Sequence, residues 1–290
     1  MDKHFIVCKY TPAILKYLSN KSVVFHISSL SQLEELKKNC ADHKIHIHCI
    51  VYKTTKYLSD IKFSEEWMDL PIAVNTVAIG KLNILLRIAP ILKKLNIRFY
   101  FSTSNKNCYS DIRILASLGY CCTLKIDGTT ADWDAITELM TYSILNVVKH
   151  AEIYPFEYVS HYYDPLIKTD FSAVYFEDPE RYLHLTNDKK LTLIPQVNGE
   201  DDTYCFDLKD FDNITKKKEY LDFKYKWQEF FIKPTPCGCC KGWRICLGKY
   251  AKYIESNPGC SDFFGEFLDI LDIQKQNDKI TKPDDKIWQP

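Results

Sequence analysis

The stretch "SVVFHISSLSQLEELKKNCADHKIHIHCIVY", residues 22–52, predicts the fold class of the chain. It begins with the apolar, β-branched run 22–28, which is typical of a buried strand. Residues 31–39 follow with the apolar spacing of a helix, and residues 44–52 form a second strand-like run. A strand, a helix and another strand within about thirty residues indicate the βαβ unit of a parallel sheet.

The same alternation continues to about residue 145. Repeated strand–helix pairs predict an α/β protein with a parallel sheet covered by helices. Pro90 lies inside the helix expected at 80–95, so we expect it to kink or divide that helix. Further strands are expected at 70–79, 97–102 and 121–127, and further helices at 80–95, 109–118 and 132–145.

The pattern changes after about residue 150. We expect short strands at 173–178 and within 181–195, with a hairpin turn around Asn187 and Asp188. A charged helix is expected over 216–230.

An amphipathic helix is expected over 261–273, with Ser261 or Asp262 as its N-cap. The domain organisation predicted from these changes is an α/β domain at 1–150, a connecting α+β region at 151–230, a cysteine-rich domain at 231–275 and a polar tail at 276–290.

The charge balance argues against a nucleic-acid partner. Lys and Arg together number 38, as do Asp and Glu, and the longest basic run, 216–218, fits a solvated helix face. The first ten residues lack the pattern of a secretory signal, and no apolar run reaches the roughly 18 residues that cross a bilayer. We therefore expect a cytoplasmic protein without a membrane partner, in which clustered cysteines indicate metal binding or catalysis rather than disulfides.

The densest chemical signal is "KPTPCGCCKGWRICLGKY", residues 233–250. Cys237, Cys240 and Cys246 have the spacing C-x2-C-x5-C, Cys260 lies thirteen residues further on, and Cys239 is an extra thiol. Thiolates at this density are costly to bury unless a cation or cluster neutralises them. Sulfur ligands without a nearby histidine favour zinc or an iron–sulfur cluster, and small buried residues at a turn are the alternative.

This spacing resembles the SPASM-type C-terminal domain of radical-SAM enzymes that modify peptides and proteins. That family's pattern is C-x2-C-x5-C-x3-C with a later lone cysteine. By resemblance, Cys237, Cys240, Cys246 and Cys260 fall on the four positions that hold the outer auxiliary [4Fe–4S] cluster. Tyr250 stands at the family's x3-C position for the inner cluster, and no matching G-x4-C lies upstream, since Gly199 and Cys205 are one residue too far apart. The resemblance implies one [4Fe–4S] cluster, with zinc as the alternative.

A second segment, "LASLGYCCTLKIDG" (115–128), is similar to the later half of the radical-SAM barrel, and the resemblance covers about 150–170 residues in all. It implies a partial or degenerate (β/α) barrel-like sheet with a small C-terminal iron–sulfur domain. The chain lacks the family's activating motif C-x3-C-x2-C, because its remaining cysteines, Cys8, Cys40, Cys49 and Cys108 among them, have no such spacing. The resemblance therefore implies a relative without radical chemistry of its own.

Three functional hypotheses follow. The first is an iron–sulfur accessory protein whose partner is a radical-SAM enzyme or a precursor peptide. The second is an enzyme that uses the ends of the late strands and the segment 150–164 directly. The third is an interaction module stapled by zinc.

Other candidate residues support these hypotheses less specifically. Asp127 and Gly128 end a strand, where either a turn or a ligand loop would lie. Cys121 and Cys122 point to opposite sides of a strand, which favours core packing, and His46 and His48 share a strand face that could be partly exposed or bind metal. Arg244 and Lys249 could stabilise an anionic cluster or lie at the surface, and a general acid–base pocket is conceivable from His150, Glu152, Glu157, His161 and Asp164.

Overall fold

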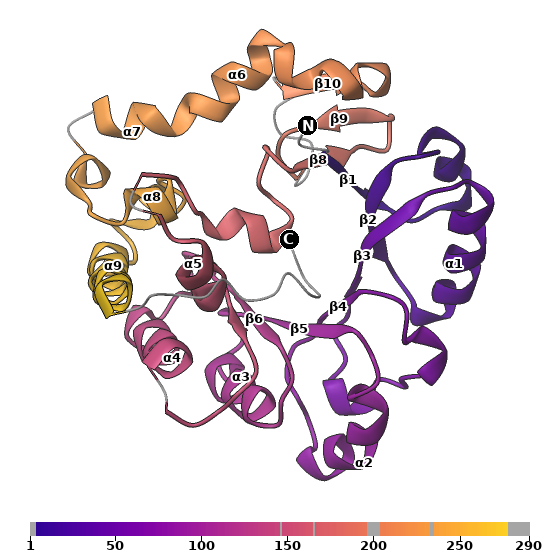
Figure 1. Ribbon diagram of the computed structural model, residues 1–290, viewed down its shortest axis with the longest axis horizontal. Helices are drawn as coiled ribbons and strands as arrows, with labels where there is room; N and C mark the ends of the chain where they lie inside the picture. The colour runs from indigo at the N-terminus through magenta and orange to yellow at the C-terminus, as the bar shows by residue number, and fades with distance from the viewer. Residues whose placement is uncertain (1–3, 146, 165, 196–203, 233–234, 278–290) are drawn as a thin grey trace. The chain divides into compact units, whose positions relative to one another are not determined.

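The computed structural model describes residues 4–145, 147–164, 166–195, 204–232 and 235–277 (Figure 1). The chain forms two compact units, each assembled from two separate stretches. The first unit comprises Met1–Tyr100 and Phe176–Lys226, and the second comprises Phe101–Tyr175 and Trp227–Pro290. The domain limits expected from the sequence stay a prediction.

The protein is an α/β protein, as the sequence predicts. In the described residues, ten strands form one mostly parallel sheet in the order β10-β9-β8-β1-β2-β3-β4-β5-β6-β7. The strands are β1 (Phe5–Lys9), β2 (Ser22–Ile27), β3 (His46–Lys53), β4 (Ile72–Asn75), β5 (Ile97–Ser102), β6 (Cys122–Lys125), β7 (Ile153–Tyr154), β8 (Tyr182–Leu185), β9 (Lys190–Thr192) and β10 (Cys205–Asp207).

The α-helices of the described chain range from one turn to five. They are α1 (Leu33–Asp42), α2 (Leu82–Leu92), α3 (Cys108–Ser117), α4 (Trp133–Leu145), α5 (Phe156–Tyr162), α6 (Lys218–Tyr225), α7 (Glu229–Ile232), α8 (Trp243–Cys246) and α9 (Cys260–Asn277). No helix among these described residues is long and apolar enough to cross a membrane.

In the first unit, parallel pairing follows chain order from β1 to β5. Val23, Val24 and Phe25 of β2 are all fully buried, as expected for a parallel strand covered on both faces. Strand β8 adds in parallel to the other side of β1 and turns back as an antiparallel hairpin with β9. Helices α1 and α2 cover one face of this part of the sheet (Figure 1).

Most element predictions are confirmed. The strand-like runs at 22–28, 44–52, 70–79, 97–102 and 121–127 are β2 to β6, and the helical patterns between and after them are α1 to α4. The hairpin turn predicted around Asn187 and Asp188 joins β8 to β9, with Lys189 in the left-handed region at φ 62°. Local pattern is sufficient in these segments because tertiary packing agrees with it.

The predicted strand at 173–178 is wrong. Residues Phe171–Tyr175 form a 3₁₀ turn, and Phe176 adopts φ 59°, which ends any extended run. Consecutive buried side chains in this segment indicated a strand, but they are buried because the turn packs inside the second unit. The Tyr175 hydroxyl donates a hydrogen bond to the Leu124 carbonyl at 2.7 Å.

Three helix predictions also need correction. Helix α2 continues through Pro90 to Leu92, so the proline, which stands in the last turn, does not divide it, and a kink there stays a prediction. The charged helix expected over 216–230 is broken after Tyr225 by a 3₁₀ turn before α7. Helix α9 begins at Cys260, so Ser261 and Asp262 lie inside its first turn and are not the N-cap.

The second unit has an aromatic core built around α9. Phe263, Phe264 and Phe267 are buried at helical spacing, and α9 packs beside α4 (Figure 1). Phe264 lies 5.6 Å from Phe171 between ring centroids, and Phe267 lies 6.1 Å from Phe156. This core fixes the element on which Cys260 stands.

Candidate metal centre

The structure places the four predicted ligand cysteines in or next to three elements of the second unit. Cys237 lies in the 3₁₀ turn η9 (Pro236–Cys239), and Cys240 follows that turn directly. Cys246 is the last residue of α8, and Cys260 is the first residue of α9. All four side chains are partly buried, whereas the extra thiol, Cys239, is exposed.

The four thiols lie close enough for their charges to interact. Burial raises the pKa of Cys246 to about 12, with further raising contributions from the charges of Cys260 and Cys237. Burial also raises the pKa of Cys260, followed by the charges of Cys240 and Cys237. The pKa of Cys237 is raised by burial and then by the charge of Cys240. Cys239 contributes to none of these shifts.

Two glycines bring the cysteine segments against their neighbours. A Cβ atom on Gly242 would collide with the Cβ atom of Phe264 on α9. Gly259 adopts φ 113°, and a Cβ there would lie 3.0 Å from the Cδ1 atom of Trp133. Only glycine permits this approach, so the cysteine segment can sit directly against α9 and α4.

A left-handed turn after α8 directs backbone N–H groups toward sulfur. Leu247 and Gly248 have φ values of 49° and 74°. Hydrogen bonds from the N–H groups of Tyr250 and Gly248 to the Cys246 sulfur oppose the effect of burial on its pKa. Such N–H to sulfur contacts are the protein's usual means of stabilising a metal-bound thiolate.

The arrangement has the donor chemistry of a metal site without the geometry of a closed one. In the described part of the chain, no group of three or more His, Cys, Asp or Glu side chains is close enough to hold a metal ion as the side chains stand. The four thiols do not form a tetrahedral shell. Protonated thiols are neutral, and metal ligation requires their deprotonation, so nothing draws the four sulfur atoms to a common centre. Four soft sulfur donors nonetheless fit zinc or an iron–sulfur cluster. Three of them lie in the segment 237–246, and the fourth is the first residue of α9.

Tyr250, which stands where the resembled family has a ligand, belongs to the aromatic core. It is buried, with its ring 5.2 Å from that of Trp133 in an edge-to-face contact and 6.0 Å from that of Phe264 in a stacked one. A bulky aromatic ring packed in this way has a structural role that a cysteine could not fill.

Trp133 is a neighbour of the site that the sequence did not single out. It is the first residue of α4, its ring contacts Gly259, and its Nε1 donor is buried with no acceptor among the described residues. Buried donors in native proteins almost always have a partner, so this N–H, on a ring that lies against Gly259, stands out among the groups around the start of α9.

The flanking cations lie over aromatic rings. The Arg244 guanidinium is 4.5 Å from the centre of the Trp243 ring, and the Lys249 ammonium is 4.7 Å from the centre of the Tyr175 ring. These cation–π contacts account for both positions, and a further role beside a cluster stays a prediction.

Asp127 and Gly128 form a turn. The Asp127 carboxylate accepts hydrogen bonds from the N–H and the hydroxyl of Thr129 at 3.0 and 2.7 Å. The Gly128 carbonyl accepts one from the Asn257 side chain at 3.0 Å, and a Cβ on Gly128 would collide with the Tyr253 ring. These contacts tie the end of the late strand to the loop before α9.

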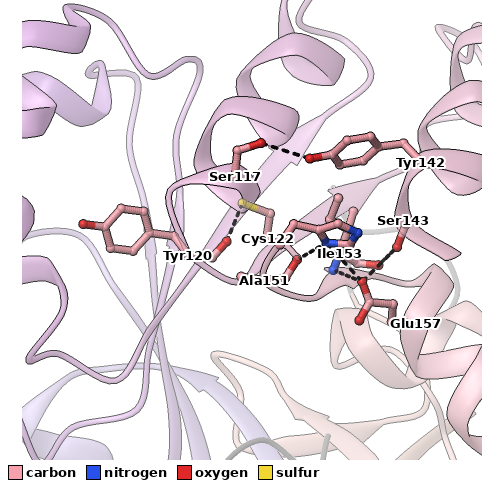
Figure 2. Close-up of polar contacts among 9 residues, drawn as sticks. Ser117, Tyr120, Cys122, Tyr142, Ser143, Ala151, Ile153 and Glu157 are labelled. Atoms are coloured by element: carbon pink, nitrogen blue, oxygen red, sulfur yellow. Dashed lines mark hydrogen bonds and ion pairs between the residues drawn. The ribbon is translucent and has the colours of Figure 1, made fainter. Parts of the chain in front are cut away.

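In the acidic and histidine-rich segment 150–164, hydrogen bonds to Glu157 join neighbouring elements (Figure 2). The Glu157 carboxylate accepts hydrogen bonds from the Ser143 hydroxyl at 3.0 Å and the Ile153 N–H at 3.1 Å, and His150 Nδ1 lies 3.8 Å away. Burial raises the pKa of Glu157. The two hydrogen bonds connect α5 to α4 and to β7.

The other members of that segment take separate places. The Asp164 carboxylate accepts a hydrogen bond from the Leu166 N–H at 2.8 Å, and His161 is exposed. Glu152 is partly buried. The structure therefore does not bring the five acids and histidines of this segment into one site.

Of the remaining candidates, His48 and Cys122 are packing residues, whereas His46 is exposed and Cys121 is partly buried. His48 lies opposite no residue of β2, at a bulge in β3, and its ring stacks on Phe5 at 3.8 Å. Burial lowers the pKa of His48 to about 4. Cys122 is fully buried and donates to the Tyr120 carbonyl, which confirms core packing for that thiol. Four other thiols are buried, namely Cys8, Cys40, Cys49 and Cys108.

Comparison with known proteins adds nothing to these observations. No family model, curated protein or solved structure matches this chain. The residues quoted above therefore carry the resemblance by themselves.

Proposed function

We propose that this chain is an iron–sulfur protein that holds one [4Fe–4S] cluster on Cys237, Cys240, Cys246 and Cys260. The observation that supports the proposal is that the pKa values of Cys237, Cys246 and Cys260 are raised by burial and then by charges within this set of four, while Cys239 is exposed. They are also the four that match the ligand spacing of the resembled SPASM-type domain. The ligand spacing and the mutual electrostatic influence of the thiols thus select the same residues.

The chain's own groups are suited to such a cofactor. A bound cluster of this type supplies reversible one-electron transfer. The N–H groups of Gly248 and Tyr250 would stabilise the Cys246 thiolate, and the positive end of the α9 dipole lies at Cys260.

We also propose that the sheet is a partial (β/α) barrel with the cysteine region as its C-terminal module. Parallel strands β1 to β5 follow chain order, which is the winding of a (β/α) barrel. A doubly wound sheet would instead reverse its strand order at a switch point.

The role that this combination supports is that of an accessory protein. The chain has no C-x3-C-x2-C motif, so it does not initiate radicals by itself. A single-cluster protein of this kind would serve a radical-SAM partner enzyme or bind its precursor peptide. We expect such an enzyme to modify its peptide faster when this chain is added.

Metal analysis tests the cluster. Protein purified without oxygen should be brown and contain about four irons per chain. Serine at Cys237, Cys240, Cys246 or Cys260 should remove most of the iron, because each change deletes a ligand. Cys239→Ser is the matched control and should retain it.

Two results would overturn the proposal. Colourless protein with one tightly held zinc would establish the zinc-stapled module instead. Equal tolerance of serine at all five positions would leave the thiols as packing residues.

A further inference from the structure

The first unit contains a cleft of about 530 Å³ that is separate from the cysteines. It opens beside the carboxyl ends of β2 and β3, where ligand sites of parallel α/β sheets lie. Its volume is in the range of ligand-binding clefts. The lining residues that matter here are Ser29, Glu34, Tyr52, Lys56, Lys62, Glu66 and Trp67.

One wall of the cleft is fixed by a helix cap. After β2 ends, the Ser28 and Ser29 N–H groups both donate to the Gln32 side-chain oxygen, at 3.1 and 3.2 Å. The Ser29 hydroxyl accepts from the Ser31 N–H, completing a capping box before α1. This wall is therefore already ordered without a ligand.

The facing wall is fixed by the segment that follows β3. The Thr76 hydroxyl donates to the Lys56 carbonyl at 2.7 Å, and the Ser59 N–H donates to the Ile79 carbonyl at 3.0 Å. A side chain on Gly80, at φ 75°, would collide with Ser59 and Tyr57. These contacts hold the backbone that carries Lys56.

The cleft has an aromatic floor. Tyr52, near the end of β3, and Trp67, in the 3₁₀ turn η4 (Glu65–Trp67), both line it and are otherwise buried. Phe63 supports the Trp67 ring in an edge-to-face contact at 6.3 Å. Aromatic faces of this kind bind apolar stems and attract cations.

Charges of both signs line the cleft. Glu34 on α1 and Glu66 on η4 both line the cleft, and the neighbouring Glu66 carboxyl group raises the pKa of Glu34. Two carboxyl groups that line one cleft favour an ammonium or guanidinium group between them. Lys56 and Lys62 line the same cleft, and among the described residues neither ammonium group forms an ion pair.

We propose that this cleft binds a peptide segment that carries both a basic and an acidic side chain. The basic group would lie between Glu34 and Glu66, and the acidic group would pair with Lys56 or Lys62. A purely basic ligand would be repelled by the lysines, and a purely acidic one by the glutamates. The charged rim is exposed, so a longer chain can continue beyond the cleft.

This inference rests on the proposed function, because it assigns a location to peptide binding. Peptide binding at this cleft does not require the cluster. It is tested with the full-length protein labelled with 5-fluorotryptophan. The Trp67 fluorine resonance is assigned through Trp67→Phe. The probes are three synthetic hexapeptides: one with alternating Lys and Glu, one with Lys alone and one with Glu alone, each spaced by Gly.

The mixed peptide should shift the Trp67 resonance saturably, and its affinity should fall as salt rises. The double variants Glu34→Gln/Glu66→Gln and Lys56→Gln/Lys62→Gln should each weaken binding at least tenfold. Glu65→Gln and Lys53→Gln are matched controls, because both residues are exposed neighbours outside the cleft lining, and they should bind as the unaltered protein does.

Equal binding of the Lys-only or Glu-only peptide, unchanged affinity in both double variants, or no shift of Trp67 would overturn the inference. The titration is repeated on Cys237→Ser protein. Binding that persists there while iron is lost separates this site from the cluster, so failure of one proposal is distinguishable from failure of the other.

Discussion

At the scale of single residues, burial determines which of the reactive side chains have structural roles. Glu157 is a carboxyl group in a buried setting, and its hydrogen bonds to Ser143 and Ile153 serve to join elements. His48 stacks on Phe5, and the resulting burial keeps it neutral at physiological pH, with a pKa of about 4. Residue type alone suggested acid–base or metal-binding roles for Glu157 and His48, but the surroundings of each side chain give it a structural role.

Glu157 provides a pH prediction. Its pKa is raised in the folded state by burial, which outweighs the lowering hydrogen bonds from Ile153 and Ser143. A raised carboxyl pKa contributes stability that is fully present below the ordinary value of 4.5 and is lost as pH rises through the folded value. Glu157→Gln keeps an acceptor oxygen without the charge. Its stability relative to the unaltered protein should therefore increase from pH 4 to pH 7.

Urea unfolding at several pH values measures this difference. Glu255→Gln, at an exposed position, is the control and should show no such trend. A pH-independent difference for Glu157→Gln would contradict the assignment of a raised pKa.

At the scale of elements, helix α9 organises the second unit. Its buried stripe of aromatic residues packs on α4, and its first residue is Cys260. The cysteine segment approaches α9 at Gly242, where the absence of a side chain leaves room for Phe264. The position of the thiols therefore depends on this close contact between the segment and the helix.

Two glycine substitutions should have opposite effects. Gly242→Ala forces a Cβ against Phe264 and should destabilise the protein by about 1–3 kcal/mol. Gly265→Ala, inside α9 and with nothing within 4 Å of the new Cβ, should stabilise it by about 0.5–1 kcal/mol. Denaturant unfolding of both variants measures the difference, and loss of iron should accompany only the first. A destabilised Gly265→Ala, or a neutral Gly242→Ala, would contradict the packing described.

At the scale of the whole molecule, neither compact unit is a continuous piece of chain. The second unit combines Phe101–Tyr175 with Trp227–Pro290, so its core joins α4 and α5 to α9 across more than a hundred residues. Phe156 and Phe171 from the first stretch contact Phe267 from the second. Each stretch needs the other to bury its aromatic face.

A truncation tests this arrangement. Protein ending at residue 226 lacks α9, so Trp133, Phe156 and Phe171 lose their partners and should become exposed. Binding of a hydrophobic dye should increase strongly, and amide exchange in α4 should accelerate. A short Gly-Ser insertion in the turn at Asn187–Asp188 is the control and should change neither. Native-like protection of α4 in the truncated chain would contradict the shared core.

The strands and α-helices between residues 22 and 145 were predictable because local propensity and burial agree there, whereas strand β1 at Phe5–Lys9 was missed. The segment 173–178 was not, since a run of buried side chains looks the same in a strand and in a packed 3₁₀ turn. The start of α9 was also missed, because the helix begins at a cysteine rather than at a residue with a typical capping side chain.

The sequence by itself determined the α/β class, the order of strands and helices, and the four thiols in a specific spacing. These properties follow from local periodicity and residue chemistry. Only the tertiary structure decided which thiols affect one another's pKa, that Trp133 lies against Gly259, and that Glu34 and Glu66 line the same cleft. Such contacts join segments that are distant along the chain, and their geometry is set by packing, on which local sequence carries no information.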